Sequence, residues 1–338
     1  MRKKNLVLNL HNYLFMDITI IIETIKQYET VLIDELDDIS LSIKNIYNEY
    51  CQQHDSSSSS SFTWVQTKYD KETNYSSPLT YADVTSHHRI GTLLQRITPT
   101  IPIVSEESYN PSSEHTNNDM KIYWLVDPLD GTKEFIQCRD EFTINIALMI
   151  HNQPVLGFVT VPVYHWIFYT PIEQTPRGVY MINTKKQTKR WIPPISSNIV
   201  QLTRPIIVTV SHSHSSDFTK EWITSFNRWV SPHSVQVKAC GSSLKMLRII
   251  MGECDIYPRF GPTMEWDTGA SDALLRAYGI SIYAISKKEK DNLDSDSFLS
   301  MITNTRTISS SSSSLSKLSY GKQGRRNEWF ILSRPLFS

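Results

Sequence analysis

Residues 124–135 read Trp-Leu-Val-Asp-Pro-Leu-Asp-Gly-Thr-Lys-Glu-Phe. The apolar run at residues 123–126 predicts a short buried strand, and Pro128 is expected to stop it because proline has no backbone N–H to donate. Gly131 permits an unusual backbone angle, after which a helical segment is expected. The stretch therefore predicts a strand that breaks into a tight turn and passes into a helix.

The predicted turn carries two carboxylates, Asp127 and Asp130, that can converge on one point. Hard oxygen donors, with the exposed backbone carbonyl of Leu129 beside them, suit Mg2+. The free amides that follow Gly131 would then face a phosphate held by the metal. Taken alone, Asp-x-x-Asp-Gly fits a plain turn equally well, since Asp, Pro and Gly are common turn residues.

The longer string favours the metal site, because residues 127–135 resemble the metal-binding signature of the inositol monophosphatase superfamily. More closely, they resemble that of the 3'(2'),5'-bisphosphate nucleotidases. Five ordered motifs are far more specific than one, and the resemblance extends from about residue 17 to the end of the chain. The other four motifs lie, in the family's order, at residues 77–83, 104–108, 241–245 and 257–268.

The resemblance implies an α/β fold of the sugar-phosphatase type, a layered sandwich in which helix and sheet layers alternate. It places most metal ligands in an N-terminal domain of helices and antiparallel sheet at residues 17–195. The last metal ligand and the nucleotide-binding residues would lie in an α/β domain at residues 196–338. Pro193-Pro194 is the expected start of the connection.

The residue pattern predicts individual elements independently of the resemblance. Apolar residues recur at helical spacing over residues 18–50, as in amphipathic helices that cover a sheet. Residues 142–150 and 154–162 predict a hairpin, and residues 174–190 predict exposed turns. Runs of six serines are expected to be solvated loops at residues 56–61 and 309–314. A second α/β unit is predicted from strands at 206–210, 235–239 and 328–332 and helices at 218–230 and 243–251.

The resemblance assigns the metal ligands to Glu106, Asp127, the Leu129 carbonyl, Asp130 and Asp267. A lone Glu after a buried strand is usually solvated. An Asp before a helical pattern, as at Asp267, is usually an N-cap. Their order in the family's motifs favours ligation of Mg2+ for both.

The resemblance also gives Asp83 and Thr132 a catalytic role, the orientation of the attacking water. The alternatives are a helix cap for Asp83 and a turn hydroxyl for Thr132. The remaining assignments concern the substrate, whose second phosphate and ribose require cations and polar donors. By resemblance, the residues that bind it are Gly131, Thr132, Lys133, His214, Ser242, Lys245 and Arg259. For these cations and the histidine, the alternative is an ordinary surface side chain.

The composition is that of an ordinary globular chain, and the resemblance implies a small nucleotide as its partner. The 338 residues are 40% hydrophobic, and Lys+Arg and Asp+Glu both number 34. Zero net charge argues against a surface for a nucleic-acid polymer or an anionic membrane. The oligomeric state stays open.

The cysteines and the N-terminus bear on the compartment. Cys51, Cys138, Cys240 and Cys254 lack Cys-x-x-Cys spacing, which disfavours a zinc site or a disulfide framework and favours a reducing compartment. Polar residues interrupt the apolar start of the chain, so neither a cleaved signal nor a membrane span is expected. The expected location is the cytoplasm, and the alternative is an organelle reached through an N-terminal targeting signal.

The expected reaction is Mg2+-dependent hydrolysis of the 3'-phosphate of adenosine 3',5'-bisphosphate to AMP and phosphate. The family implies action on 3'-phosphoadenylyl sulfate, a role in sulfur assimilation and inhibition by Li+. One alternative is an inositol phosphate phosphatase. Another is a nucleotide-binding sensor without turnover, because Tyr75 occupies a place where the family usually has an Asp and Asp70 is displaced by several residues.

Overall fold

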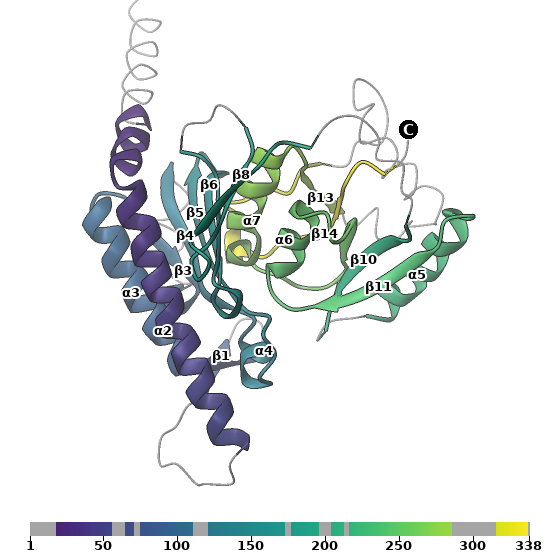
Figure 1. Ribbon diagram of the computed structural model, residues 1–338, viewed down its shortest axis with the longest axis horizontal. Coiled ribbons are helices and arrows are strands. Elements are labelled where there is room, and N and C mark those ends of the chain that lie inside the picture. The colour runs from purple at the N-terminus through teal and green to yellow at the C-terminus, as the bar shows by residue number, and fades with distance from the viewer. Residues whose placement is uncertain are drawn as a thin grey trace, which may run out of the picture.

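Helices and sheets alternate in layers, which confirms the predicted α/β sandwich (Figure 1). Helices α2 (Glu29–Asp55) and α3 (Tyr81–Ile97) cover one face of a seven-stranded sheet. Helices α6 (Leu244–Ile250) and α7 (Glu265–Tyr278) lie between this sheet and a five-stranded one, whose other face is covered by α5 (Asp217–Trp229). The computed structural model describes residues 18–55, 65–70, 75–110, 121–172, 177–195, 204–212, 216–285 and 316–336.

The seven-stranded sheet has the order β3-β4-β5-β6-β7-β8-β9; β3 and β4 are parallel and the later pairs antiparallel. The predicted hairpin is β5–β6. The prediction of turns alone over residues 174–190 is wrong, because β8 and the edge strand β9 form there. The exposed polar residues at the start of β9 hide its strand pattern. The strands are β3 (Ile103–Ser105), β4 (Ile122–Asp130), β5 (Thr143–Ile150), β6 (Gln153–Val161), β7 (Trp166–Tyr169), β8 (Val179–Asn183) and β9 (Thr188–Ile192).

The five-stranded sheet has the order β11-β10-β12-β14-β13 and contains the strands predicted beyond residue 205. The two pairs that involve β10 are parallel, and β14 runs antiparallel to both its neighbours. The domain boundary at residues 195/196 stays a prediction. The strands are β10 (Ile206–Ser211), β11 (Val235–Cys240), β12 (Ile256–Arg259), β13 (Ile282–Ile285) and β14 (Trp329–Ser333).

Strand β4 is buried on both faces, which explains its unbroken apolar sequence. Because side chains alternate along a strand, Tyr123 and Leu125 face the core between the two sheets. Trp124 and Val126 face the core beneath α2 and α3. The residues that follow this strand are therefore held firmly from two sides.

Helix α7 lies directly against the centre of the seven-stranded sheet, on β4, β5 and β6. A Cβ atom at Gly157 of β6 would stand 2.2 Å from the Ala270 carbonyl oxygen of α7. Only glycine permits so close an approach. The contact places the first turn of α7 beside the end of β4.

The amphipathic helices predicted over residues 18–50 are confirmed, since residues 18–27 and α2 are helical. Leu32, Leu36, Ile39 and Ile43 of α2 are buried against the sheet and α3. Among the described residues, no helix combines the length and the apolarity that a membrane crossing requires. Both serine runs lie outside the described residues.

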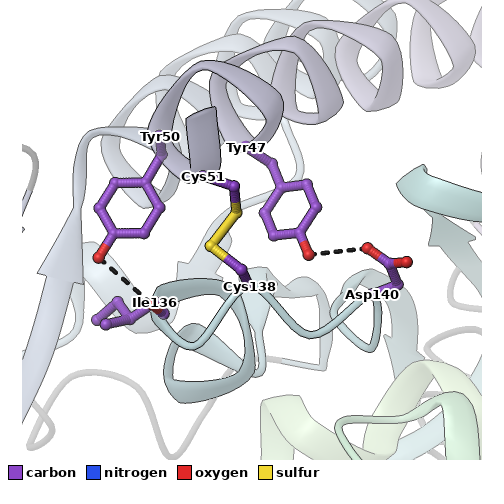
Figure 2. Close-up of a disulfide and its surroundings, with 6 residues drawn as sticks. All are labelled: Tyr47, Tyr50, Cys51, Ile136, Cys138 and Asp140. Atoms are coloured by element: carbon purple, nitrogen blue, oxygen red, sulfur yellow. Dashed lines mark hydrogen bonds between the residues drawn. A yellow bond between two sulfur atoms is a disulfide. The ribbon is translucent and has the colours of Figure 1, made fainter. Parts of the chain in front are cut away.

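A disulfide joins Cys51 of α2 to Cys138, which follows α4 (Thr132–Ile136) (Figure 2). The expectation that no such bridge forms is wrong. The two cysteines are 87 residues apart in sequence, but packing of α4 against α2 brings their Cα atoms to 5.8 Å, within the range a disulfide spans. Tyr47 donates a hydrogen bond to Asp140 beside the bridge, at 2.8 Å. Together these contacts fix α4 to the helix layer.

A short hairpin, β1 (Val65–Asp70) and β2 (Tyr75–Thr80), stands apart from the large sheets. Its second strand leads directly into α3 and lies near α4. Asp70 and Tyr75 occupy opposite positions in its register. Asp70 therefore lies across the hairpin from Tyr75, the position at which the family usually has an Asp. That Asp70 substitutes for the missing Asp stays a prediction.

Candidate active site

An irregularity in β4 brings Asp127 and Asp130 together. Asp127 pairs with Asn145 of β5 and Asp130 with Thr143, so three steps on β4 match two on β5. Residues three apart on a regular strand face opposite ways, and the extra residue turns both carboxylates to the same side. Pro128 does not stop the strand, contrary to prediction, because its missing N–H falls within this bulge.

Asp267 completes a cluster with these two carboxylates. One oxygen from each of Asp127, Asp130 and Asp267 lies within 4.8 Å of the others. Asp267 is the third residue of α7 rather than its N-cap, which is Met264. Its carboxylate accepts a hydrogen bond from the Met264 backbone N–H at 2.9 Å, so capping and a place in the cluster coexist. The structure thus brings the predicted ligands together from two distant parts of the sequence.

Glu106 and the Leu129 carbonyl border the same cavity. Glu106 opens the short 3-10 helix η1 (Glu106–Ser108) directly after β3. Because β3 runs parallel to β4 with Ser105 opposite Val126, the next residues, Glu106 and Asp127, emerge side by side. All five predicted ligand positions therefore line one cavity of about 210 Å³.

The electrostatics of this cluster favour a bound cation. Burial raises the pKa of Asp127 well above its ordinary value, and the nearby charges of Glu106, Asp130 and Asp267 raise it further. Burial and the charge of Asp130 raise the pKa of Asp267 to about 7. Converging oxygen donors that repel one another in this way fit a hard divalent cation, which would neutralise them.

Two residues that the sequence analysis left without a role position Asp130. The Ser243 backbone N–H donates to Asp130 Oδ2 at 2.7 Å, and the Ser243 hydroxyl lies 2.8 Å from the same oxygen. Asn145 Nδ2 lies 3.3 Å from that oxygen and donates to the Ser243 hydroxyl at 3.0 Å. A polar Asn in the otherwise apolar strand at 142–150 was the signal that could have revealed this contact.

Asp83 and Thr132 meet at the edge of the cluster. The Thr132 hydroxyl lies 3.1 Å from Asp83 Oδ1 and 3.3 Å from the Leu129 carbonyl oxygen. Asp83 also caps α3, since its other oxygen accepts hydrogen bonds from the Thr80 N–H and hydroxyl. Burial raises the pKa of Asp83 to about 7, although these hydrogen bonds lower it in part. The cap and the contact with Thr132 use different oxygens of one carboxylate.

Comparison with known proteins identifies the wider group. The model of the inositol monophosphatase family matches residues 43–316. The chain belongs to this family. It is similar to two curated relatives described as 3'(2'),5'-bisphosphate nucleotidase CysQ, from Salmonella typhimurium and Escherichia coli. They are 37% identical over 223 and 227 residues, respectively, and each match covers 66% of this chain and 82% of the relative.

Solved structures of the inositol monophosphatase family share the fold. The crystal structure of CysQ from Bacteroides thetaiotaomicron is 29% identical with a TM-score of 0.57, and the match covers 75% of this chain and 84% of that one. A staphylococcal inositol monophosphatase has a TM-score of 0.56, covering 91% of this chain and 90% of that one. At 13% identity, the second likeness concerns the fold alone.

In this member of the inositol monophosphatase family, three cations also line the cavity. Lys133, Lys245 and Arg259 all border it. Lys245 is buried rather than on the surface; its Nζ donates to the Cys240 carbonyl at 3.2 Å and lies 5.3 Å from the centre of the Tyr257 ring. Arg259 is also buried and donates to the Pro262 carbonyl at 2.6 Å. The predicted substrate cations thus face the carboxylate cluster across one space.

Gly131 and Ser242 meet where the two halves of the cavity join. Gly131 has φ 98°, as predicted, and a Cβ there would lie 3.2 Å from Ser242 Cβ and 3.1 Å from the Glu141 carbonyl. Ser242 also has a positive φ, and its hydroxyl accepts a hydrogen bond from the Leu244 N–H. His214, the remaining predicted substrate residue, lies outside the described residues.

Proposed function

We propose that this chain is a 3'(2'),5'-bisphosphate nucleotidase that converts adenosine 3',5'-bisphosphate to AMP and phosphate. One observation carries the proposal: a carboxylate cluster and three cations line the same cavity. Cleavage of one phosphate requires the carboxylate cluster, which would hold the metal. A second phosphate would be recognised by the cations. The nucleotidase relatives, matched over 82% of their length, support this substrate class.

We propose Mg2+ as the metal, held by Glu106, Asp127, Asp130, Asp267 and the Leu129 carbonyl. An all-oxygen donor set that shares its pocket with phosphate is the arrangement Mg2+ prefers. When bound, Mg2+ would neutralise charge on the phosphoryl and leaving oxygens. The other functions in the site then fall to the side chains around it.

Asp83 and Thr132 would orient the attacking water. A hydroxyl that donates to Asp83 keeps its lone pairs available, so Thr132 can accept a hydrogen bond from water in a fixed direction. With a pKa of about 7, Asp83 is suited to take up a proton near neutral pH. This division of roles accounts for a carboxylate that caps a helix and still contacts Thr132 at the cavity wall.

Lys245 and Arg259 would bind the second phosphate and the ribose, with Ser242 and the predicted contact from His214. Gly131, Thr132 and Lys133 would hold the phosphate that is cleaved. Tyr257 and Phe330 give the cavity an apolar wall beside these cations. The proposal extends to 3'-phosphoadenylyl sulfate, which carries the same 3'-phosphate, and to inhibition by Li+.

The cytoplasm is the proposed location. Because cytosolic thiols are normally kept reduced, the Cys51–Cys138 pair would be mainly in its thiol form there. Thiol trapping in intact cells tests this expectation. A bridge that is fully oxidised in cells would exclude a reducing compartment.

The activity is tested by phosphate release from adenosine 3',5'-bisphosphate, with inositol 1-phosphate in parallel, each with and without Mg2+ and Li+. Mg2+-dependent, Li+-sensitive release from the nucleotide alone is expected. Release from inositol 1-phosphate alone would reassign the substrate. Tight nucleotide binding without release would identify a sensor.

A further inference from the structure

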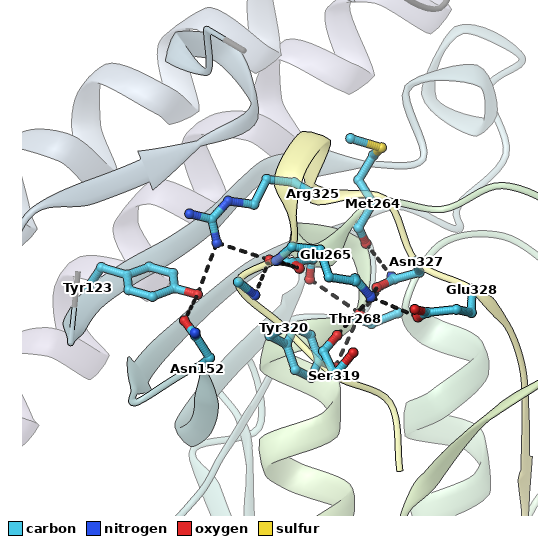
Figure 3. Close-up of polar contacts among 12 residues, drawn as sticks. Tyr123, Asn152, Met264, Glu265, Thr268, Ser319, Tyr320, Arg325, Asn327 and Glu328 are labelled. Atoms are coloured by element: carbon cyan, nitrogen blue, oxygen red, sulfur yellow. Dashed lines mark hydrogen bonds and ion pairs between the residues drawn. The ribbon is translucent and has the colours of Figure 1, made fainter. Parts of the chain in front are cut away.

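A network of polar residues surrounds the start of α7, the helix that carries Asp267 (Figure 3). At its centre Arg325 Nη1 lies 3.1 Å from Glu265 Oε2. Both side chains are inaccessible to solvent, with 2% of Arg325 and 0% of Glu265 exposed. The same Nη1 donates to the Tyr123 hydroxyl at 3.1 Å, and the guanidinium lies 5.1 Å from the centre of that ring.

The partners of Arg325 belong to the two elements that carry metal-site carboxylates. Glu265 is the first residue of α7, two positions before Asp267. Tyr123 lies on β4, four positions before Asp127 and on the same face of the strand. Arg325 itself comes from a third segment, η5 (Gln323–Arg325). One guanidinium therefore connects the start of α7 to β4, the two elements whose carboxylates meet at the cavity.

Residues 320–327, here termed the clamp, hold the first turn of α7 on both sides of Asp267. The Gly321 and Lys322 backbone N–H groups donate to the two oxygens of Glu265, at 3.0 and 2.9 Å. Asn327 Nδ2 donates to the Met264 carbonyl at 2.7 Å and to the Thr268 hydroxyl at 3.1 Å. The residues that bracket Asp267 are thus fixed, while its carboxylate stays directed at the cavity.

A buried ion pair is a poor device for stability alone, because removing two charges from water costs about as much as their attraction returns. What it supplies is a fixed geometry, since both oxygens of Glu265 and a planar guanidinium are engaged in set directions. The carboxylates of Asp127, Asp130 and Asp267 repel one another. Contacts from residues outside the cluster are therefore needed to keep their end of α7 against β4 before a cation binds.

We infer that Arg325 is a positioning residue that acts through Glu265 and Tyr123 to set Asp267 opposite Asp127. The inference rests on the proposed function for the identity of the site, but it concerns how the site is assembled. Its consequence is measurable without turnover: the clamp determines how tightly the protein binds Mg2+.

The test measures Mg2+ binding by titration calorimetry in the absence of substrate, together with urea unfolding. Arg325→Met removes the positive charge and keeps an unbranched apolar side chain. Arg325→Lys keeps the charge but lacks the planar guanidinium group. Tyr123→Phe deletes only the hydroxyl on β4 and leaves the fold least disturbed. The matched control is Arg276→Met, which breaks the Arg276–Asp272 pair further along the same helix.

Arg325→Met is expected to weaken Mg2+ binding about 10-fold, the lower end of the range for residues that orient metal ligands. Arg325→Lys should fall between it and the parent, and Tyr123→Phe should lose about threefold by removing one of the two connections. Arg276→Met should lose stability and keep its Mg2+ affinity. If Arg325→Met does not fold, Tyr123→Phe decides the question.

Three outcomes distinguish a failure of the inference from a failure of the proposed function. Parent-like Mg2+ affinity in both Arg325→Met and Tyr123→Phe overturns the inference. An equal loss in Arg276→Met also overturns it, because any weakening of α7 would then suffice. A parent protein that binds no Mg2+ contradicts the proposed metal site instead.

Discussion

Thr132 Oγ1 and Asp83 Oδ1 lie 3.1 Å apart, although the two residues belong to different helices and are 49 residues apart in sequence. Asp83 is fixed by the cap of α3, and Thr132 by the first turn of α4. Ser86 of α3 also donates to the Pro128 carbonyl at 2.7 Å, which fastens the helix to the bulge in β4. The alignment of hydroxyl and carboxylate is therefore determined by three rigid elements.

Thr132→Ala should lower kcat by about 100- to 10,000-fold, the usual contribution of a positioned proton-transfer group, and leave the KM for the nucleotide little changed. Thr132→Ser keeps the hydroxyl and should retain most of the rate. Steady-state phosphate release measures both variants. If Thr132→Ala released phosphate as fast as Thr132→Ser, the Thr132 hydroxyl would have no role in catalysis.

Asp127→Asn should abolish turnover and yet stabilise the metal-free protein at pH 8. Burial and three neighbouring carboxylates raise the pKa of Asp127, so its charge is unfavourable in the empty site. A gain of about 1–3 kcal/mol in the free energy of unfolding is expected, the size over which single substitutions usually act. Urea unfolding with EDTA measures it. A destabilised variant with normal activity would show that Asp127 is not part of the metal site.

The stability of the metal-free protein should fall as the pH rises from 5 to 8. The pKa values of Asp83 and Asp267 are raised from 3.8 to about 7, so between about pH 4 and 7 the folded state binds more protons than the unfolded state. Stability then decreases with pH through that window. Urea unfolding at a series of pH values checks this, and a rising stability would contradict the raised pKa values.

Added Mg2+ should oppose that trend, because it takes the place of the protons. At 100 times its dissociation constant a ligand of the folded state adds about 2.7 kcal/mol. The gain in thermal midpoint should therefore be larger at pH 8 than at pH 5, where protons compete. Ca2+ and K+ added at the same concentration provide the comparison for ion specificity.

Lys245→Ala and Arg259→Ala should each weaken nucleotide binding by about 10- to 100-fold, since a hydrogen bond to a charged group contributes about 1.5–3 kcal/mol. Mg2+ affinity should stay unchanged. Lys220→Ala, at an exposed ion pair on α5, is the matched control. Unaltered nucleotide affinity in the two cavity variants would refute their assignment.

Reduction of the Cys51–Cys138 bridge should lower the free energy of unfolding by about 2–4 kcal/mol, because it releases a long closed loop in the unfolded chain. The Cys51→Ser variant should match the reduced parent and show no further response to reductant. A bridge that is absent from the purified protein, or whose reduction leaves the urea midpoint unchanged, would contradict this prediction.

The sequence predicted the layered fold and the cluster because both depend on local signals arranged in order. Apolar periodicity located α2, the β5–β6 hairpin and β10, and the motif at residues 127–135 located two carboxylates. The bulge at Pro128 escaped prediction because it depends on pairing with β5. The start of α7 was less predictable: an N-cap was the alternative weighed for Asp267, whereas the helix begins two residues earlier at Glu265.

Long-range pairs of ordinary residues could not be read from the sequence. Cys51 and Cys138 carry no spacing pattern, and their bridge exists because two helices pack. Arg325 and Glu265 are 60 residues apart in sequence, and the apolar periodicity of α7 gives no sign of a partner for Glu265. Such contacts are decided by tertiary packing, and only the assembled molecule reveals them.

The position of β14 between β12 and β13 has a consequence for biosynthesis. Arg259 of β12 pairs with Phe330 of β14, so the strand that carries this cavity-lining arginine lacks one neighbour until residues 329–333 have emerged from the ribosome. The clamp is made only just before that strand. A nascent chain can fold its first sheet and helix layer early, but the pairing of β12 with β14 forms only after residues 329–333 have been made.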